Sequence, residues 1–108
     1  MTNTIMAIVA ALILTENSGP TEIGKAGEVG ILQIGDQMMA EYARLGGKLP
    51  PEARRSPMKA KQMATLILTR RMEKRGLRGD REACVAYAAW LWNPRDSRYC
   101  ERVKGNMR

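Results

Sequence analysis

The sequence predicts a mainly helical architecture, with about five helices around one buried central helix and a small loop or hairpin region. A nearly uninterrupted apolar stretch near the start of the chain predicts the central helix. Later segments begin at capping residues and end at glycine or proline, as helices do. At 108 residues, the chain has the length of one domain, which we expect to cover residues 1–108.

The first helix is expected from about Asn3 to Glu16, because its residues are apolar almost all round. Its run Ile5–Leu14 has the length of a signal peptide, but no Lys or Arg precedes it and no small-x-small cleavage site follows. The run is also too short to span a bilayer. We therefore expect it to stay in the mature protein, without a recognisable export signal. Glycines, Pro20 and short β-prone pieces then predict a loop or hairpin over 18–35.

A second helix is expected over about Gln37–Arg44, closed by Gly46 and Gly47, and followed by a connector over 48–51. Ser56 and Pro57 form a typical helix start, with a serine cap and proline at the first helical position. Gly76 ends that third helix.

Asp80 is the expected cap of a fourth helix that reaches about Trp90, with apolar residues at helical spacing. The segment 92–94 breaks this helix, and a last short helix starts at Asp96 or Ser97 and runs through Val103.

Composition excludes several kinds of chemistry. The chain has no histidine, so it cannot contain a Ser-His-Asp triad, a Cys-His pair or a metal site that needs imidazole. Cys84 and Cys100 are its only cysteines, too few for a four-cysteine zinc site, and we expect both to be reduced. No metal or cofactor is expected.

The net charge of +7 predicts an anionic partner, either nucleic acid or a bacterial cell wall, although a solvated basic face is a simpler alternative. The densest basic stretch comprises Arg70, Arg71, Lys74, Arg75, Arg78 and Arg81.

Glu16 is the strongest candidate for catalysis. A carboxyl group at the end of a buried helix is placed to hold a proton near neutral pH, and the glycine-containing loop behind it allows close approach of a long ligand. This combination indicates a general acid that acts on a glycan, although a helix-end carboxylate exposed to water is the alternative. Glu22, Glu28 and Asp36 are the nearby second carboxylates, and each also fits a solvated loop residue. Without a second carboxylate, the substrate itself must supply the nucleophile.

Three motifs resemble those of the lysozyme-like lytic transglycosylases, particularly the small forms of phages and bacterial chromosomes. The segment Glu16-Asn17-Ser18 resembles the family's glutamate–serine motif with one residue inserted, and residues 27–34 resemble its Gly-x-x-Gly motif followed by apolar residues and glutamine. Residues 92–94 and 99–103 are similar to its last motif, but the glycines after the asparagine are missing.

The resemblance implies a lysozyme-like fold and a peptidoglycan-cleaving enzyme that acts on the cell wall, in the periplasm or outside the cell. Glu16 would protonate the bond between N-acetylmuramic acid and N-acetylglucosamine, then deprotonate the muramoyl 6-hydroxyl to close a 1,6-anhydro ring. The implied substrate-binding residues are Ser18, Gly30, Gln33, Tyr87, Trp92 and Asn93. Gln33 would contact an acetamido group or Glu16, and Trp92 would offer a flat face to a sugar.

Alternatives to these roles stay open. Gln33 is otherwise a loop-capping amide, and Trp92 and Tyr87 are otherwise core residues. A basic helical nucleic-acid-binding protein would turn the residues from Arg70 to Arg81 towards phosphates, although no helix carries the Arg, Asn and Gln run that suits base edges. A lysozyme-like assembly protein without activity is the third possibility.

Overall fold

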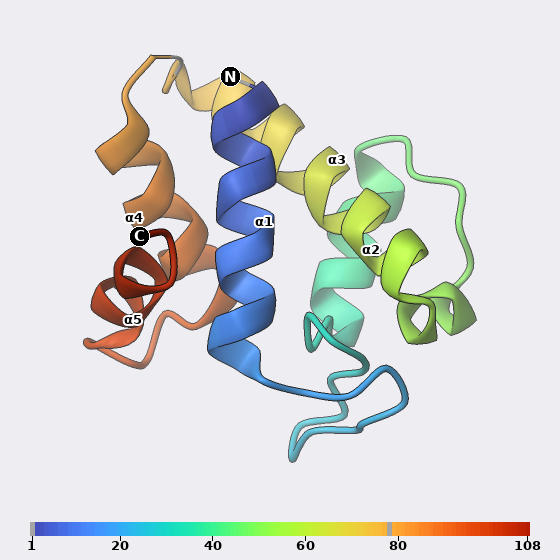
Figure 1. The fold of residues 1–108 in the computed structure, drawn as a ribbon. Helices are drawn as coiled ribbons and strands as arrows, with labels where there is room; N and C mark the ends of the chain where they lie inside the picture. Colours follow the sequence, from blue (N-terminus) through green and yellow to red (C-terminus); the bar gives the residue numbers. More distant parts are fainter. Residues whose placement is uncertain (1, 78) are drawn as a thin grey trace. The chain divides into compact units, whose positions relative to one another are not determined.

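The computed structural model describes residues 2–77 and 79–108. Its described part is mainly helical, and its β-structure is limited to isolated bridges between Ile23 and Val29 and between Val29 and Ile34. This confirms the predicted fold class. The helices are α1 (Thr2–Glu16), α2 (Asp36–Arg44), the 3-10 helix η1 (Pro51–Arg55), α3 (Pro57–Arg75), α4 (Arg81–Trp92) and α5 (Tyr99–Gly105), drawn in Figure 1.

The chain forms two compact units, which we describe separately. The helical unit contains the residues up to Thr15 together with Leu68–Arg108, and the loop unit contains Glu16–Ile67. Helix α3 contributes its residues 57–67 to the loop unit and its residues 68–75 to the helical unit.

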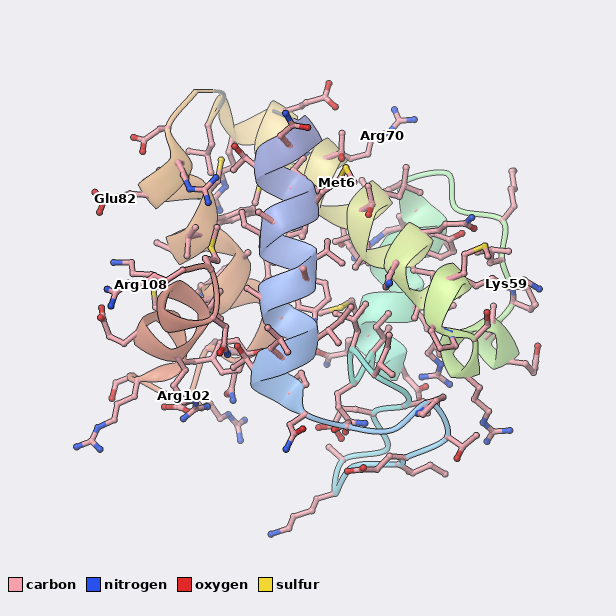
Figure 2. The ribbon with its side chains drawn as sticks, viewed as in Figure 1. Met6, Lys59, Arg70, Glu82, Arg102 and Arg108 are labelled. Atoms are coloured by element: carbon pink, nitrogen blue, oxygen red, sulfur yellow. The ribbon has the colours of Figure 1, made fainter. Side chains whose placement is uncertain are left out.

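In the helical unit, α1 buries Ile5, Ile8 and Leu12 almost completely, whereas Leu14 is exposed. Met6 of the same helix is also exposed (Figure 2). The end of α1 is joined to the residue after α5 by a side-chain hydrogen bond, which Asn106 Nδ2 donates to Thr15 Oγ1 at 2.8 Å. None of the described helices is long and apolar enough to cross a membrane.

Helices α4 and α5 pack against each other in the same unit. The predicted cap of α4 is confirmed, because Asp80 Oδ1 accepts a hydrogen bond from the backbone N–H of Ala83 at 3.0 Å. The helix ends at Trp92, two residues later than expected, and Pro94 lacks the N–H that another turn would need.

The predicted start of the last helix at Asp96 or Ser97 was wrong, since α5 begins at Tyr99. Asp96 instead accepts a hydrogen bond from the backbone N–H of Arg98 at 2.9 Å and holds a turn before the helix. The side chain of Asp96 also pairs with Arg102 at 2.7 Å. The N–H of Arg98 first, and then Arg102, lower the pKa of the Asp96 carboxyl group.

In the loop unit, α2 closes as predicted, because Gly46 adopts a positive φ of 95° and its N–H reaches the Ala43 carbonyl. The additional helix η1, which was not predicted, begins at Pro51, the last residue of the expected connector. Helix α3 begins at Pro57 as predicted, and Ser56 Oγ accepts the N–H of Lys59 at 3.4 Å.

Both cysteines are free thiols, as predicted. Cys84 is buried and donates its S–H to the Leu77 carbonyl oxygen at 3.3 Å. Burial is the main cause that raises the pKa of the Cys84 thiol, and the nearby Asp80 carboxylate adds to it.

Candidate active site

Glu16 is the last residue of α1, and its side chain is partly buried. The helix stops there because Asn17 adopts a left-handed conformation with φ of 50°, which asparagine tolerates better than most residues. The hydroxyl group of Ser18 donates a hydrogen bond to the Glu16 carbonyl oxygen at 3.2 Å. Ser18 therefore stabilises the turn that directs the chain from the helix into the loop.

The loop over residues 18–35 is held by backbone hydrogen bonds around the buried residue Val29. Val29 and Ile34 exchange both of their backbone hydrogen bonds at 3.1 Å, and the N–H of Gly24 reaches the Glu28 carbonyl at 2.7 Å. Leu32 and Ile34 are completely buried. The loop is therefore an ordered part of the unit, and its apolar side chains belong to the buried core.

Gly30 is required in this loop for two reasons. It adopts a φ of 88°, which L-residues with a side chain rarely adopt, and a Cβ atom added to it would collide with the carbonyl oxygen of Arg54. Its own N–H donates to the Glu22 carbonyl at 2.9 Å. The backbone of Gly30 thus lies against η1 with no room for any side chain.

Gln33 also lies in the left-handed region, with φ of 48°. Its Nε2 donates to the carbonyl oxygens of Gly30 at 2.9 Å and Glu22 at 3.2 Å, so both amide hydrogens are used inside the loop. Its Oε1 accepts no hydrogen bond from the described residues. The side chain therefore caps the loop, and its carbonyl oxygen lies against Gly24.

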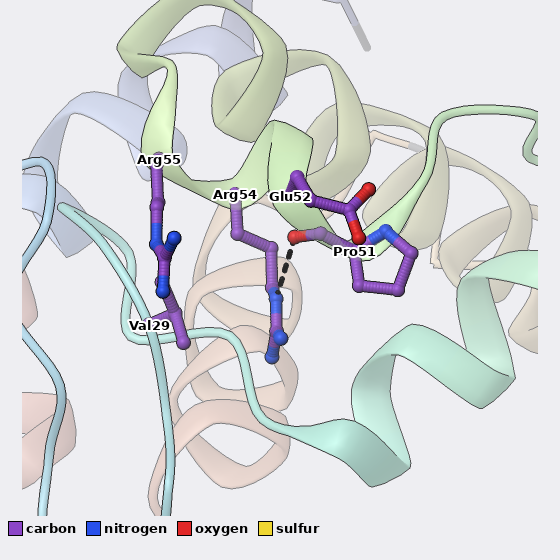
Figure 3. Close-up of a pocket in the computed structure, with 5 residues that line it drawn as sticks. All are labelled: Val29, Pro51, Glu52, Arg54 and Arg55. Atoms are coloured by element: carbon purple, nitrogen blue, oxygen red, sulfur yellow. Dashed lines mark hydrogen bonds between the residues drawn. The ribbon is translucent and has the colours of Figure 1, made fainter.

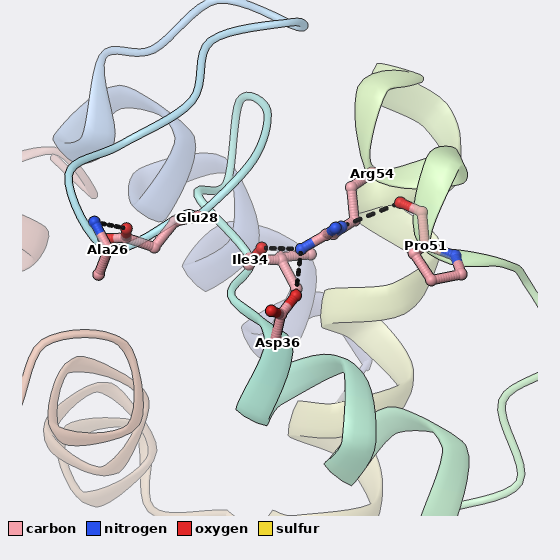
Figure 4. Close-up of polar contacts among 6 residues, drawn as sticks. All are labelled: Ala26, Glu28, Ile34, Asp36, Pro51 and Arg54. Carbon is pink, nitrogen blue, oxygen red and sulfur yellow. Dashed lines mark hydrogen bonds and ion pairs between the residues drawn. The ribbon is translucent and has the colours of Figure 1, made fainter.

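The three other candidate carboxylates serve the loop or face solvent. Glu22 is exposed and accepts the N–H of Gly19 at 3.2 Å, and Glu28 is partly buried and accepts the N–H of Ala26 at 2.7 Å (Figure 4). The side chain of Asp36 is 96% exposed. The expected solvated character is confirmed for Glu22 and Asp36, whereas Glu28 is more enclosed than expected.

Arg54 is a contact residue that sequence reasoning missed. Its side chain is only 11% exposed, and its Nη1 donates to the Ile34 carbonyl at 2.8 Å while its Nε donates to the Pro51 carbonyl at 2.9 Å (Figures 3 and 4). Together with Val29, Pro51, Glu52 and Arg55, it lines a pocket of about 230 Å³. No sequence motif marks this arginine, because its role depends on the position of η1 against the loop.

In the helical unit, Tyr87 is buried and hydrogen-bonded. Its hydroxyl oxygen accepts a hydrogen bond from Arg71 Nε at 2.8 Å, and the guanidinium group of Arg75 lies 5.0 Å from the centre of its ring. This environment matches the core alternative for Tyr87 better than an exposed sugar platform. Trp92 is the last residue of α4 and is partly buried, and Asn93 follows it as the C-cap.

Trp90, which helical spacing groups with Tyr87, is 53% exposed. It lines a pocket of about 170 Å³ between α4 and α5, together with Ala86, Ala89, Asn93 and Asp96. Sequence spacing missed this site, because periodicity identifies a shared helix face but not which of its residues stays open to solvent.

Most of the basic stretch is solvent-accessible. Arg70, Lys74, Arg75 and Arg81 are exposed, and Figure 2 shows Arg70 pointing away from α3. Arg71 is partly buried against Tyr87, and the predicted contribution of Arg78 lies outside the described residues. In the described part of the chain, no group of three or more Asp, Glu or Cys side chains could hold a metal ion.

No curated protein and no solved structure matches the chain. The family model described as the transglycosylase SLT domain matches residues 2–97, which is nearly the whole chain. Members of that family act on peptidoglycan, and their activity is of the lytic transglycosylase type. The chain therefore belongs to the transglycosylase SLT domain family.

Proposed function

We propose that this chain is a peptidoglycan lytic transglycosylase that cuts the bond between N-acetylmuramic acid and N-acetylglucosamine with Glu16 as its only catalytic carboxyl group. The observation that carries the proposal is the position of Glu16, at the C-terminal end of α1 and directly before the loop that contains Gly30 and Gln33.

In the proposed reaction, Glu16 donates its proton to the glycosidic oxygen as the bond from that oxygen to muramoyl C1 breaks. The resulting carboxylate then removes the proton of the muramoyl 6-hydroxyl, and the 6-oxygen forms a bond to C1. The product is a 1,6-anhydromuramoyl end, and Glu16 regains its proton. The 6-hydroxyl belongs to the same sugar, so it is present at a high effective concentration without a positioned water.

The remaining loop carboxylates support a mechanism with one glutamate. Glu22 and Glu28 each accept a backbone N–H of the loop, and Asp36 is almost fully exposed beside Arg54. A hydrolase with two carboxylates would need one of these groups as its base or nucleophile. Because Glu22 and Glu28 already hold the loop and Asp36 faces solvent, none of the three is a good candidate for that role.

The substrate contacts belong to the same proposal. Gln33 would accept a hydrogen bond from an acetamido N–H through its unused Oε1, while Gly30 lets the backbone approach the strand and Ser18 holds the turn beside Glu16. Trp92 and Asn93 would contact the sugars. Tyr87 would act indirectly, by holding the side chains next to it in position. The whole chain would act as one catalytic domain.

The basic stretch would face the anionic wall. Arg70, Lys74 and Arg81 are exposed and suited to long-range attraction. The alternative of nucleic-acid binding is weaker, because Arg71 is tied to the Tyr87 hydroxyl and Arg75 lies over the Tyr87 ring.

The test compares Glu16→Gln with matched changes of the other carboxylates, Glu22→Gln, Glu28→Gln and Asp36→Asn, on purified sacculi. Loss of a general acid costs about 10²- to 10⁴-fold, so Glu16→Gln should release almost no product, whereas the three controls should keep most of the activity. Mass spectrometry should find muramoyl ends lighter by one water than reducing ends.

Three results would contradict the proposal. Reducing ends as the main product would identify a hydrolase, and retained activity in Glu16→Gln would remove Glu16 from the reaction. Wild-type protein that binds sacculi but releases no product would instead identify a silent assembly protein.

A further inference from the structure

Trp90 presents an indole ring to solvent on α4. It is 53% exposed, although tryptophan is usually well covered in folded proteins. No described residue accepts a hydrogen bond from its indole N–H. A large aromatic surface left open together with an unused donor is typical of a contact site.

The ring is held in place before any ligand binds. It stacks on Tyr87 with ring centres 6.0 Å apart and an angle of 22° between the rings. Tyr87 is itself fixed by the hydrogen bond from Arg71 at 2.8 Å and by the guanidinium group of Arg75. Because its position is set in advance, Trp90 loses little conformational freedom when a ligand covers it.

The neighbours of Trp90 leave space beside the indole ring. Ala86 lies one helical turn earlier, where a longer side chain would cover the ring, and Ala89 is equally small. The resulting pocket has a volume of about 170 Å³, below the usual range for drug-sized ligands and suited to a single sugar ring. At the same pocket, the side chain of Asn93 makes no hydrogen bond to the described residues.

The charge of the pocket selects among sugars. Among the described residues that line it, Asp96 alone is charged, and its carboxylate pairs with Arg102 at 2.7 Å and accepts the N–H of Arg98. The pocket therefore offers no unpaired positive charge to the carboxylate of a muramic acid. An uncharged amino sugar with an acetamido group fits it better.

We infer that the pocket between α4 and α5 binds an N-acetylglucosamine ring of the peptidoglycan strand. The apolar face of the sugar lies on Trp90, and the free amide of Asn93 bonds to the acetamido group or a hydroxyl. This inference rests on the glycan substrate of the proposed function and names residues of the helical unit that hold the strand.

The experiment uses full-length Glu16→Gln protein labelled with ¹⁵N, so that added glycan stays intact, and tri-N-acetylchitotriose as the probe. The chain contains two tryptophans, so two indole N–H signals are expected, and Trp90→Phe assigns them. The Trp90 signal should move on titration. Trp90→Ala should weaken binding about threefold to tenfold, the worth of one aromatic stacking contact.

Two further variants separate binding from folding. Ala86→Leu adds a side chain at an exposed position and should block the pocket as strongly as Trp90→Ala. Met6→Ala removes an exposed apolar side chain elsewhere in the same unit and should leave the affinity unchanged. The inference is overturned if the Trp90 signal stays fixed, if Ala86→Leu binds normally, or if the signal moves with protein concentration alone.

The outcome is independent of cleavage. Normal release of anhydro product without a response of Trp90 would reject this site and leave the proposed function intact. A response of Trp90 in a protein that never cleaves sacculi would reject the proposed function alone.

Discussion

Replacing Arg54 with methionine should destabilise the protein by about 2–4 kcal/mol. Methionine keeps much of the buried volume but donates no hydrogen bond, so the carbonyl groups of Ile34 and Pro51 both lose their charged donor. A hydrogen bond to a charged group contributes about 1.5–3 kcal/mol. The Arg54 side chain is only 11% exposed, so the variant also avoids the cost of burying a charged guanidinium group. This gain offsets part of the free energy lost with the two hydrogen bonds.

The ion pair between Arg54 and Asp36 should contribute almost nothing to this loss. Its two atoms are 3.5 Å apart, but the Asp36 side chain is 96% exposed, and exposed pairs contribute about 0–1 kcal/mol. Asp36→Asn is therefore the matched control, with an expected change within about 0.5 kcal/mol. Arg54→Lys should fall between the two variants, because an ammonium group keeps the charge but lacks the planar fork that reaches both carbonyls.

Urea unfolding followed by circular dichroism measures these differences, and the slope with denaturant should stay constant across the series. The reasoning is refuted if Arg54→Met unfolds within about 0.5 kcal/mol of the wild type. It is also refuted if Asp36→Asn costs as much as Arg54→Met, since the exposed ion pair would then be the dominant contact.

One other prediction follows from the backbone, and two follow from the thiols. Gly30→Ala should lower the unfolding free energy clearly more than Gly27→Ala, because both have positive φ but only Gly30 lacks space for a Cβ; equal melting temperatures would contradict this. An alkylating reagent at pH 8 should modify Cys100 well before Cys84, as peptide mass spectrometry can test, because burial raises the pKa of Cys84 and the thiolate is the reactive form. The same shift should lower stability as the pH rises above about 8.5, where the unfolded thiol ionises first; faster labelling of Cys84 would argue against its burial.

Helix starts and ends were predictable where the signal is local. Asp80, the Ser56–Pro57 pair and Gly76 each act on backbone groups within a few residues, so the sequence alone identifies them. The start of α5 was placed too early, because Asp96 uses its carboxylate to hold a turn first. A carboxylate that caps a helix and one that holds a turn both accept a hydrogen bond from a backbone N–H. The sequence alone therefore does not distinguish these two roles.

The candidate site was predictable only in part. The glutamate at the end of a helix and the glycine pattern behind it are readable from spacing, whereas the partners of Gln33 and Arg54 depend on how distant backbone segments meet. Tyr87 and Trp90 lie three residues apart on one helix face. Arg71, on a different helix, donates a hydrogen bond to the Tyr87 hydroxyl, and the spacing of residues within α4 does not predict this contact.

The left-handed conformation of Gln33 has a consequence for how this position can change. A side chain in that region costs about 1–2 kcal/mol, and the two hydrogen bonds of its amide return about 0.5–1.5 kcal/mol each. The backbone cost and the hydrogen-bond contribution nearly cancel. Replacing Gln33 with glycine or asparagine would therefore change the stability little, and the protein would reach a similar abundance in a cell. Folding alone therefore does not require a glutamine at position 33, and the proposed contact with the glycan is the property that this side chain would add.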